Sequence, residues 1–259
     1  QKGLYIKNFG CQMNVYDGDR MQEMMSSHNY DSVNSVEDAD LVILNTCHIR
    51  EKATEKIYSE LGRIKKNISG KKEKTIVAVA GCVAQAEGEE LVKRAPIIDL
   101  VFGPLTYHHL PDILQSFEND NLNKKKAIVD IEPPNEDKFT ELPKRLKDNR
   151  AISAFLSVQE GCDKFCTFCV VPYTRGVETS RSFLEIKDEA NQLISTGVQE
   201  IILLGQNVNA WSNSNGKKMD FADLIYELSL LDLKRIRFTT SHPNDMNHKL
   251  ISSFRDVEK

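Results

Sequence analysis

Short apolar runs alternate with helical patterns along the first part of the chain. The runs lack a strict polar alternation, which is typical of parallel strands covered on both faces. Between them, apolar residues recur at helical spacing, as at Ala53, Ile57, Leu61 and Ile64. Residues 1–118 are therefore predicted to form an α/β domain with a flavodoxin-like, doubly wound parallel sheet. The predicted strands are residues 4–9, 40–46, 75–81 and 99–103.

The pattern changes between residues 119 and 150. Asn, Lys, Asp, Glu and Pro dominate this stretch, and Pro133-Pro134 cannot continue a regular element. We expect a linker or a peripheral excursion between two domains.

A second alternation begins at Ala151. Apolar runs at 152–158, 201–204 and 236–240 predict strands. Helical patterns separate the strands, with Ser182 and Asp220 as predicted N-caps and Gly197 as a helix end. Residues 151–259 are predicted to form the first part of a (β/α) barrel that this chain does not complete.

Composition places the chain among globular proteins. Hydrophobic residues make up 40% and charged residues 28%, and the formal net charge is −4. No apolar run is long enough to cross a membrane and no signal-peptide pattern opens the chain, so we expect no membrane and a cytoplasmic location. Lysine-rich segments at 65–74, 124–126 and 144–150 are solvated surface or phosphate-binding sites. The chain begins with Gln1 rather than Met and stops without an ending signal, which suggests a fragment.

Six cysteines in a reducing compartment are poor candidates for disulfides. Three of them, Cys162, Cys166 and Cys169, lie in one predicted loop with the spacing C-x3-C-x2-C. Three nearby thiolates can bind one [4Fe–4S] cluster and leave one iron without a protein ligand, which is the open position that catalysis needs. The alternative is a zinc site with a distant fourth ligand such as His242.

The other three cysteines each follow a predicted strand. Cys11, Cys47 and Cys82 are far apart in sequence, but the carboxyl ends of parallel strands meet at one edge of a sheet. We infer a second [4Fe–4S] cluster on these three residues, again with one open iron. The alternative is that they are three buried structural thiols.

The loop segment GCDKFCTFC resembles the signature of the radical S-adenosylmethionine (SAM) superfamily. The resemblance implies that the open iron binds SAM and that its reductive cleavage releases a 5′-deoxyadenosyl radical. It also implies that Phe168, just before the last cysteine, packs against the adenine of SAM; a core position for Phe168 is the alternative.

Two clusters in this order resemble the radical SAM methylthiotransferase family. The words GCQMN, NTCHIREKA, GCVAQ, GCDKFCTFCVVPYTRG, SRS, LLGQNVNAW and RFTTSHP are similar to that family and cover essentially the whole chain. NTCHIREK, GCVAQ and TTSHP resemble the tRNA branch that acts on isopentenylated adenosine, with one departure at His48, where this branch more often has Ser.

The resemblance implies an enzyme that adds a methylthio group to N6-isopentenyladenosine at position 37 of tRNA, beside the anticodon. It implies two [4Fe–4S] clusters and SAM as cofactors, and as partners tRNA, a flavodoxin-like low-potential electron donor and a sulfur source. The family also carries a small C-terminal RNA-binding β-barrel, which we expect to be absent from this chain. Two kinds of alternative remain: a methylthiotransferase for threonylcarbamoyladenosine tRNA or a ribosomal-protein aspartate, and a non-catalytic iron–sulfur scaffold.

Further candidates lie near the predicted strand ends of the second domain. Backbone or side-chain groups there are expected to contact SAM. The alternative for residues 205–207 is a plain turn, and the alternative for Arg175 is a structural ion pair. Trp211 is predicted to pack in the core or to stack on a base, and His108 and His109 to begin a helix. The SAM candidates are Gly205, Gln206, Asn207, Ser241 and Arg175.

Overall fold

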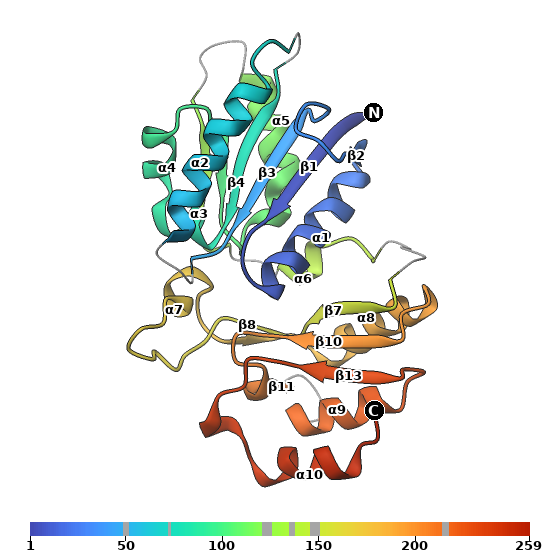
Figure 1. The fold of residues 1–259 in the computed structure, drawn as a ribbon. Helices are drawn as coiled ribbons and strands as arrows, with labels where there is room; N and C mark the ends of the chain where they lie inside the picture. Colours follow the sequence, from blue (N-terminus) through green and yellow to red (C-terminus); the bar gives the residue numbers. More distant parts are fainter. Residues whose placement is uncertain (49–51, 72–73, 121–125, 135–137, 146–150, 214–217) are drawn as a thin grey trace. The chain divides into compact units, whose positions relative to one another are not determined.

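A computed structural model describes residues 1–48, 52–71, 74–120, 126–134, 138–145, 151–213 and 218–259. The chain divides into two compact units, Gln1–Pro143 and Lys144–Lys259 (Figure 1). Each unit has its own sheet and its own core, and each is described separately.

Unit 1 is built on a six-stranded, fully parallel sheet with the order β2-β1-β3-β4-β5-β6. The central strands β3 and β4 are buried along their whole length, as expected for strands covered on both faces. The predicted doubly wound, flavodoxin-like sheet is confirmed. The strands are β1 (Lys2–Asn8), β2 (Tyr30–Ser32), β3 (Leu41–Thr46), β4 (Ile76–Gly81), β5 (Leu100–Phe102) and β6 (Ile128–Asp130).

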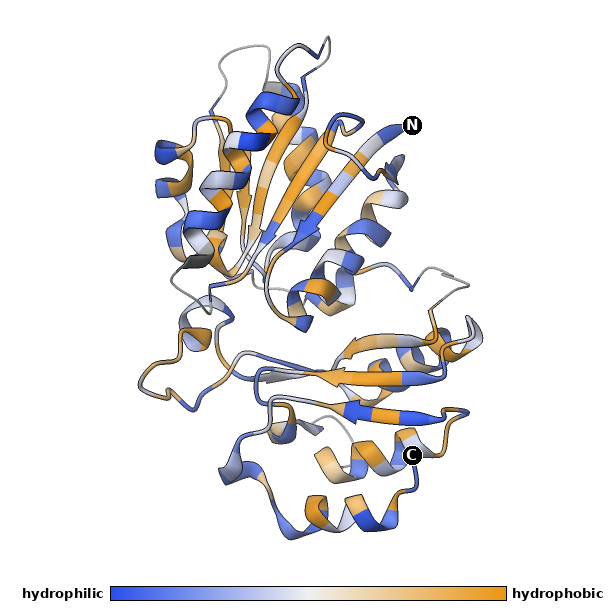
Figure 2. Cartoon of the chain, in the orientation of Figure 1, coloured by the Kyte–Doolittle hydropathy of each residue, from blue (hydrophilic) through white to orange (hydrophobic). Residues whose placement is uncertain are grey.

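Helices cover both faces of this sheet (Figure 1). The helices α1 and α5 pack on one face and α2, α3 and α4 on the other, which gives two separate hydrophobic clusters. In Figure 2 the central strands are the most continuously apolar part of this unit. The helices are α1 (Gln12–Ser26), α2 (Lys52–Asn67), α3 (Cys82–Glu87), α4 (Glu89–Arg94), the 3-10 turn η1 (Tyr107–His109), α5 (Leu110–Asp120) and α6 (Lys138–Glu141).

The interpretation of 119–150 as a linker or peripheral excursion is wrong for two segments. Strand β6 extends the sheet by pairing with β5, although its apolar residues Ile128 and Val129 are surrounded by charged sequence. Helix α6 is anchored through the buried Lys138, whose Nζ donates to the Pro104 carbonyl at 3.0 Å and lies 4.9 Å from the Tyr107 ring centroid. Neither element could be predicted from this polar composition. For α6 in particular, burial of a single lysine leaves no apolar pattern in the sequence.

Unit 2 contains a three-stranded parallel sheet with the order β13-β10-β7. Helices α8 and α9 cover one face, where alternate residues of all three strands join one core with Trp211 and Leu250. Ser182 caps α8 by accepting from the Glu185 amide, and Asp220 caps α9, both as predicted. The predicted first part of a β/α barrel is confirmed. The main elements are β7 (Ser153–Ser157), α8 (Phe183–Ser195), β10 (Glu200–Leu204), α9 (Phe221–Ser229), β13 (Arg235–Phe238) and α10 (His248–Asp256).

Short elements complete unit 2 around the ends of these strands. An antiparallel pair joins Gln159 to Ser180 and Glu160 to Thr179, and so closes the base of a loop that carries the clustered cysteines. A second short pair lies before α9. These elements are β8 (Gln159–Glu160), α7 (Val171–Thr174), β9 (Thr179–Ser180), η2 (Val208–Ala210), β11 (Ser212–Asn213), β12 (Met219–Asp220) and η3 (Pro243–Asp245).

Candidate functional site

The three dispersed cysteines of unit 1 lie at the carboxyl ends of adjacent strands. Strands β1, β3 and β4 are neighbours in the sheet, with Asn8 opposite Asn45 and Thr46 opposite Gly81 in register. Cys11, Cys47 and Cys82 follow these strand ends, so the topology gathers them at one edge, as the sequence predicts. Cys47 and Cys82 are buried and Cys11 is half-buried.

Two glycines let the backbone approach these cysteines closely. Gly10 has φ +103°, and a Cβ at this position would lie 2.2 Å from Cβ and 2.7 Å from Sγ of Cys47. Gly81 has φ +87°, and a Cβ there would lie 2.4 Å from the Thr46 carbonyl oxygen. Any larger residue at either position would displace the cysteine edge, so the glycines are part of the site.

Asparagine side chains brace the same edge. Nδ2 of Asn45 donates to Oδ1 of Asn8 at 3.0 Å and to the Asn14 carbonyl at 2.6 Å. Asn14 in turn donates to the Phe9 carbonyl at 3.0 Å, and its Oδ1 lies 3.6 Å from Sγ of Cys11. These asparagines were not predicted from sequence, because the two bonds of Asn45 that join them span more than thirty positions along the chain.

In unit 2, the loop between β8 and β9 carries Cys162, Cys166 and Cys169. Gly161 and Gly176 both have positive φ, and the Cys162 amide donates to the Gly176 carbonyl at 3.3 Å. The Cys169 amide donates to the Cys166 carbonyl at 2.8 Å, which winds the last two cysteines into a turn. Burial raises the pKa of the Cys162 thiol, and the neighbouring Cys166 and Cys169 add to the shift.

The end of β10 holds the base of this loop. The Asn207 amide donates to Oε1 of Gln159 at 3.0 Å, and Oε1 of Gln206 accepts from the Gly161 amide at 2.5 Å. A Cβ at Gly205 would lie 2.5 Å from Oε1 of Gln159, so a larger residue here would require the Gln159 side chain to shift. The three predicted SAM contacts at 205–207 therefore bind the cysteine loop itself; their contact with SAM remains a prediction.

A polar network that was not predicted from sequence joins the loop to the end of β13. Lys164, between two cysteines, forms an ion pair with Asp245 at 2.8 Å. Nδ2 of Asn207 donates to Asp245 at 2.8 Å and to Glu178 at 3.2 Å. Burial would raise the pKa of Asp245, but the hydrogen bonds from Asn207 and Lys164 outweigh it and lower that pKa. The network fixes the loop between Cys162 and Cys166.

The segment after β13 contains Ser241 and His242. Ser241 is exposed, whereas the His242 amide donates to Oδ1 of Asn209 at 2.8 Å, and its Nε2 lies 3.9 Å from Sγ of Cys166. This contact is the one that a zinc site would need. Within the described ranges, however, no group of three or more His, Cys, Asp or Glu side chains is arranged around a single metal ion. Three thiols in one loop are a ligand set that an iron–sulfur cluster takes.

The remaining predicted residues differ in how far their side chains are exposed. Arg175 is 3% exposed and pairs with Glu160 at 2.8 Å, so the ion pair that was the alternative interpretation is present. The contact of Arg175 with SAM remains a prediction. Trp211 is buried, with Nε1 donating to the Arg181 carbonyl at 2.9 Å, so it packs in the core rather than stacking on a base. Phe168 is 94% exposed, which excludes the core position.

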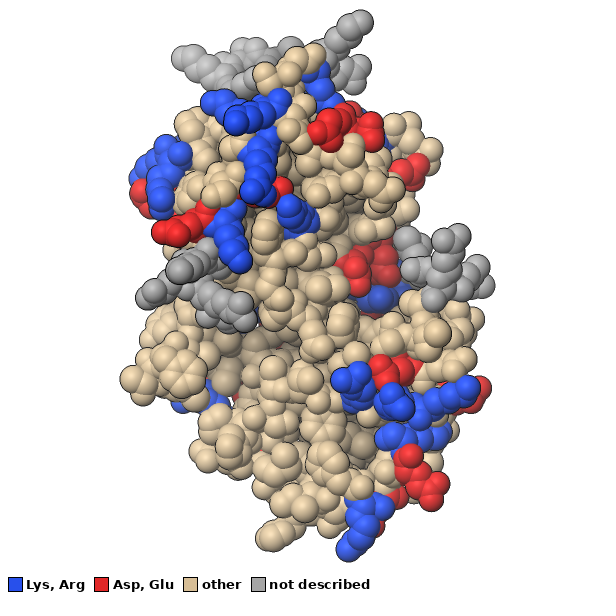
Figure 3. Space-filling view, viewed as in Figure 1, with Lys and Arg blue, Asp and Glu red and all other residues tan. Residues whose placement is uncertain are grey.

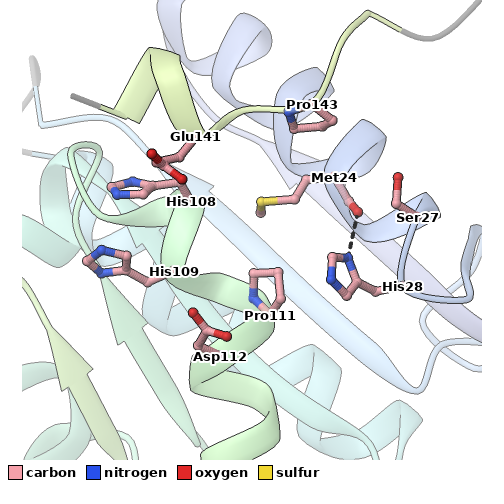
Figure 4. Close-up of a pocket in the computed structure, with 9 residues that line it drawn as sticks. All are labelled: Met24, Ser27, His28, His108, His109, Pro111, Asp112, Glu141 and Pro143. Atoms are coloured by element: carbon pink, nitrogen blue, oxygen red, sulfur yellow. Dashed lines mark hydrogen bonds between the residues drawn. The ribbon is translucent and has the colours of Figure 1, made fainter. Parts of the chain in front are cut away.

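A pocket of about 590 Å³ in unit 1 is lined by three histidines: His28, just after α1, and His108 and His109 of η1 (Figure 4). Nδ1 of His28 lies 3.0 Å from the Met24 carbonyl, and Nδ1 of His109 lies 2.8 Å from Asp130. The turn η1 leads directly into α5, which confirms that His108 and His109 begin a helix. The pocket lining contains no cysteine.

Comparisons with known proteins match each of the two units. Residues 3–103 match the model of the family described as Uncharacterized protein family UPF0004, and residues 156–257 match the Radical SAM superfamily. The chain belongs to the radical SAM methylthiotransferase family. Superfamily membership implies an iron–sulfur cluster and SAM as cofactors.

Several curated relatives have the same name. The tRNA-2-methylthio-N(6)-dimethylallyladenosine synthase of Bartonella quintana is 54% identical over 99% of this chain and 57% of the relative. The protein of that name from Ruegeria pomeroyi is 56% identical over 97% of this chain and 56% of its own length. The chain therefore spans a little over half the length of the relatives it matches.

A solved structure supports the fold. The radical SAM methyltransferase TsrM from Kitasatospora setae matches with a TM-score of 0.61 and 13% identity, over 99% of this chain and 58% of that one. No helix in the described parts of the chain is long and apolar enough to cross a bilayer.

Proposed function

We propose that this protein is a tRNA methylthiotransferase that converts N6-isopentenyladenosine at position 37 to its 2-methylthio derivative. The observation that supports this proposal most strongly is the presence of two separate sets of three cysteines. One set follows the carboxyl ends of β1, β3 and β4, and the other lies in the loop that follows β7 and β8. Identities above 50% to synthases of this name support the substrate. Only one cluster follows from superfamily membership; the second cluster, on Cys11, Cys47 and Cys82, is part of the proposal.

The two cysteine sets have different tasks in this proposal. Cys162, Cys166 and Cys169 hold the cluster whose open iron binds SAM; when bound, the clusters and SAM supply the 5′-deoxyadenosyl radical and the sulfur. The loop residues hold these thiols in place through Lys164 and Asn207. Phe168, exposed next to Cys169, packs against the adenine of SAM. Cys11, Cys47 and Cys82 hold the second cluster, which retains the sulfur.

The proposed reaction also needs an electron donor and a sulfur source. We propose a low-potential, flavodoxin-like donor and an external sulfur supply, since neither an electron nor a methylthio sulfur comes from amino acid side chains of this chain. Purified protein, reconstituted without oxygen and given dithionite, sulfide, SAM and an isopentenylated anticodon stem-loop, should form the 2-methylthio nucleoside, detected by mass spectrometry. A product only on threonylcarbamoyladenosine RNA or on ribosomal protein would replace the proposal with a sister activity. No 5′-deoxyadenosine at all would favour the non-catalytic scaffold.

Basic side chains on α2 offer a surface for the RNA backbone. Lys56, Arg63 and Lys66 lie on the exposed side of this helix, and Figure 3 shows basic side chains gathered over it. Arg63 pairs with Glu60 at 3.2 Å. Because its side chain is 75% exposed, the guanidinium can also contact a phosphate. These charges would supply attraction without sequence preference.

Reversing these three charges should weaken tRNA binding and its salt dependence. Lys56→Glu, Arg63→Glu and Lys66→Glu together remove about three phosphate contacts, which should reduce the slope of log affinity against log salt by roughly 2 to 3. Fluorescence anisotropy gives the affinity at salt concentrations from about 50 to about 300 mM, a range around the physiological value, and hence this slope. A control triple variant, Lys93→Glu, Lys218→Glu and Lys234→Glu, makes the same charge change at exposed sites elsewhere. Equal slopes in both variants would show that α2 does not contact RNA.

A further inference from the structure

The cysteine loop of unit 2 exposes an unusual number of large apolar side chains. Phe165 is 62% exposed and Tyr173 and Val177 are each 74% exposed, and Phe168 is exposed as noted above. In Figure 2, apolar segments alternate with polar ones in the loop around α7. Single exposed apolar residues are ordinary, but Phe165 and Tyr173 lie together as a ring pair, and grouped exposed apolar side chains mark binding sites.

Phe165 has a backbone conformation that places its ring outward. Its φ of +46° lies in the left-handed region, which a bulky residue rarely adopts. Its neighbour Lys164 is tied to Asp245 at 2.8 Å, and the loop base is closed by the Cys162 amide and the Gly176 carbonyl. A strained residue that its surroundings hold in place, on a loop with functional cysteines, indicates a functional position.

The outward rings of Phe165 and Tyr173 form a pair. Their centroids are 6.4 Å apart and their planes meet at 83°, an edge-to-face arrangement. Such a pair presents one ring face and one ring edge, and it adjoins Cys166 in sequence. An aromatic face beside the radical-forming loop suits a planar base that must be brought close to the reacting centre.

The charge of the loop restricts what this base can carry. Between Gly161 and Glu178 the only cationic side chains are Lys164 and Arg175, and both are already in ion pairs, with Asp245 and Glu160. A threonylcarbamoyl group brings a carboxylate, for which the loop offers no uncompensated positive charge. An isopentenyl group is a branched hydrocarbon, which matches the exposed apolar side chains.

We infer that Phe165 and Tyr173 form the platform that binds the isopentenylated adenine of the RNA substrate and selects it over the unmodified base. This inference rests on the proposed function. The adenine stacks on the aromatic pair, and the isopentenyl group covers the apolar surface between Tyr173 and Val177. Phe168 is not part of the platform, since it is assigned to SAM.

The test compares two anticodon stem-loops that differ only in the isopentenyl group. Fluorescence anisotropy on the reconstituted protein gives the ratio of their affinities, which should favour the modified RNA in the wild type. Tyr173→Ala should reduce that ratio by roughly five- to tenfold, because this ring supplies part of the apolar surface under the isopentenyl group. Phe165→Leu should weaken the binding of both RNAs by roughly five- to tenfold, the effect expected for loss of stacking on one ring. Tyr226→Ala on α9 and Phe254→Leu on α10 are matched controls, because these rings are 57% and 66% exposed in unit 2; they should leave the ratio unchanged.

Each outcome is decided by the ratio together with three companion measurements. Iron content shows whether Phe165→Leu still loads its cluster; if it does not, Tyr173→Ala alone decides. An unchanged ratio in Tyr173→Ala overturns the platform, and weaker SAM binding or a lower melting temperature with that unchanged ratio would assign the ring to the cofactor or to protein packing. Failure of the proposed function is a separate result: the wild type would then form no methylthio product, whatever its preference between the two RNAs.

Discussion

Cys47→Ala should abolish formation of the methylthio nucleoside and leave 5′-deoxyadenosine formation measurable. Cys47 lies between the other two cysteines of unit 1, because β3 is the strand between β1 and β4. Its loss leaves two thiols, too few to hold a [4Fe–4S] cluster firmly. SAM cleavage depends on the cysteine loop of unit 2, which is held by Gly176, Gln206 and Asp245 of the same unit. Chromatography of both products from the same reaction measures the two activities.

Cys166→Ala is the matched control for Cys47→Ala. The same exchange in the other cysteine set should abolish both products, since no radical forms without the cluster of unit 2. Loss of both products in Cys47→Ala would show that the sets are not independent. Retention of methylthio transfer in Cys47→Ala would remove the proposed role of unit 1.

Gly10→Ala should have nearly the same effect as losing a cysteine, although it changes no ligand. A Cβ at this position would lie 2.7 Å from Sγ of Cys47, and φ +103° is unfavourable for alanine. The thiol must move away from the edge where Cys11 and Cys82 lie. We expect iron content after reconstitution to fall from about eight to about four per chain, with methylthio transfer lost.

Gly62→Ala is the control for this backbone effect. Gly62 lies on the exposed side of α2, and a Cβ there would have no atom within 4 Å. The exchange should keep full iron content and raise the free energy of unfolding by about 0.5–1 kcal/mol, because alanine loses less backbone entropy in a helix. Thermal unfolding and iron analysis of both variants separate the two cases. Full iron content in Gly10→Ala would contradict the close approach of Gly10 to Cys47.

The strands that carry the cysteines could be predicted because their apolar runs are long and unbroken. The runs at 40–46 and 75–81 correspond to β3 and β4 with an error of one residue at most. The three-residue strands β2 and β6 could not be found in this way, since pairing with a longer neighbour forms them and their own sequences, YDS and IVD, have little pattern. Tertiary pairing outweighed local sequence in both.

The same distinction holds for the site. The cysteine positions could be predicted, because strand ends in a parallel sheet must meet at one edge. The supporting groups could not: Lys164 and Asp245 are 81 positions apart, and Asn207 reaches Glu178 and Asp245 only through the fold. For Arg175 the sequence allowed both an ion pair and a ligand contact, and only the fold shows the ion pair with Glu160.

The central claim is that one chain holds two iron–sulfur clusters, one on each set of three cysteines. Iron and acid-labile sulfide on the anaerobically reconstituted protein test it most directly. We predict about eight irons and about eight sulfides per chain, falling to about four of each in Cys47→Ala and in Cys166→Ala alike. About four irons in the wild type, all lost in Cys166→Ala and none in Cys47→Ala, would show that unit 1 carries no cluster.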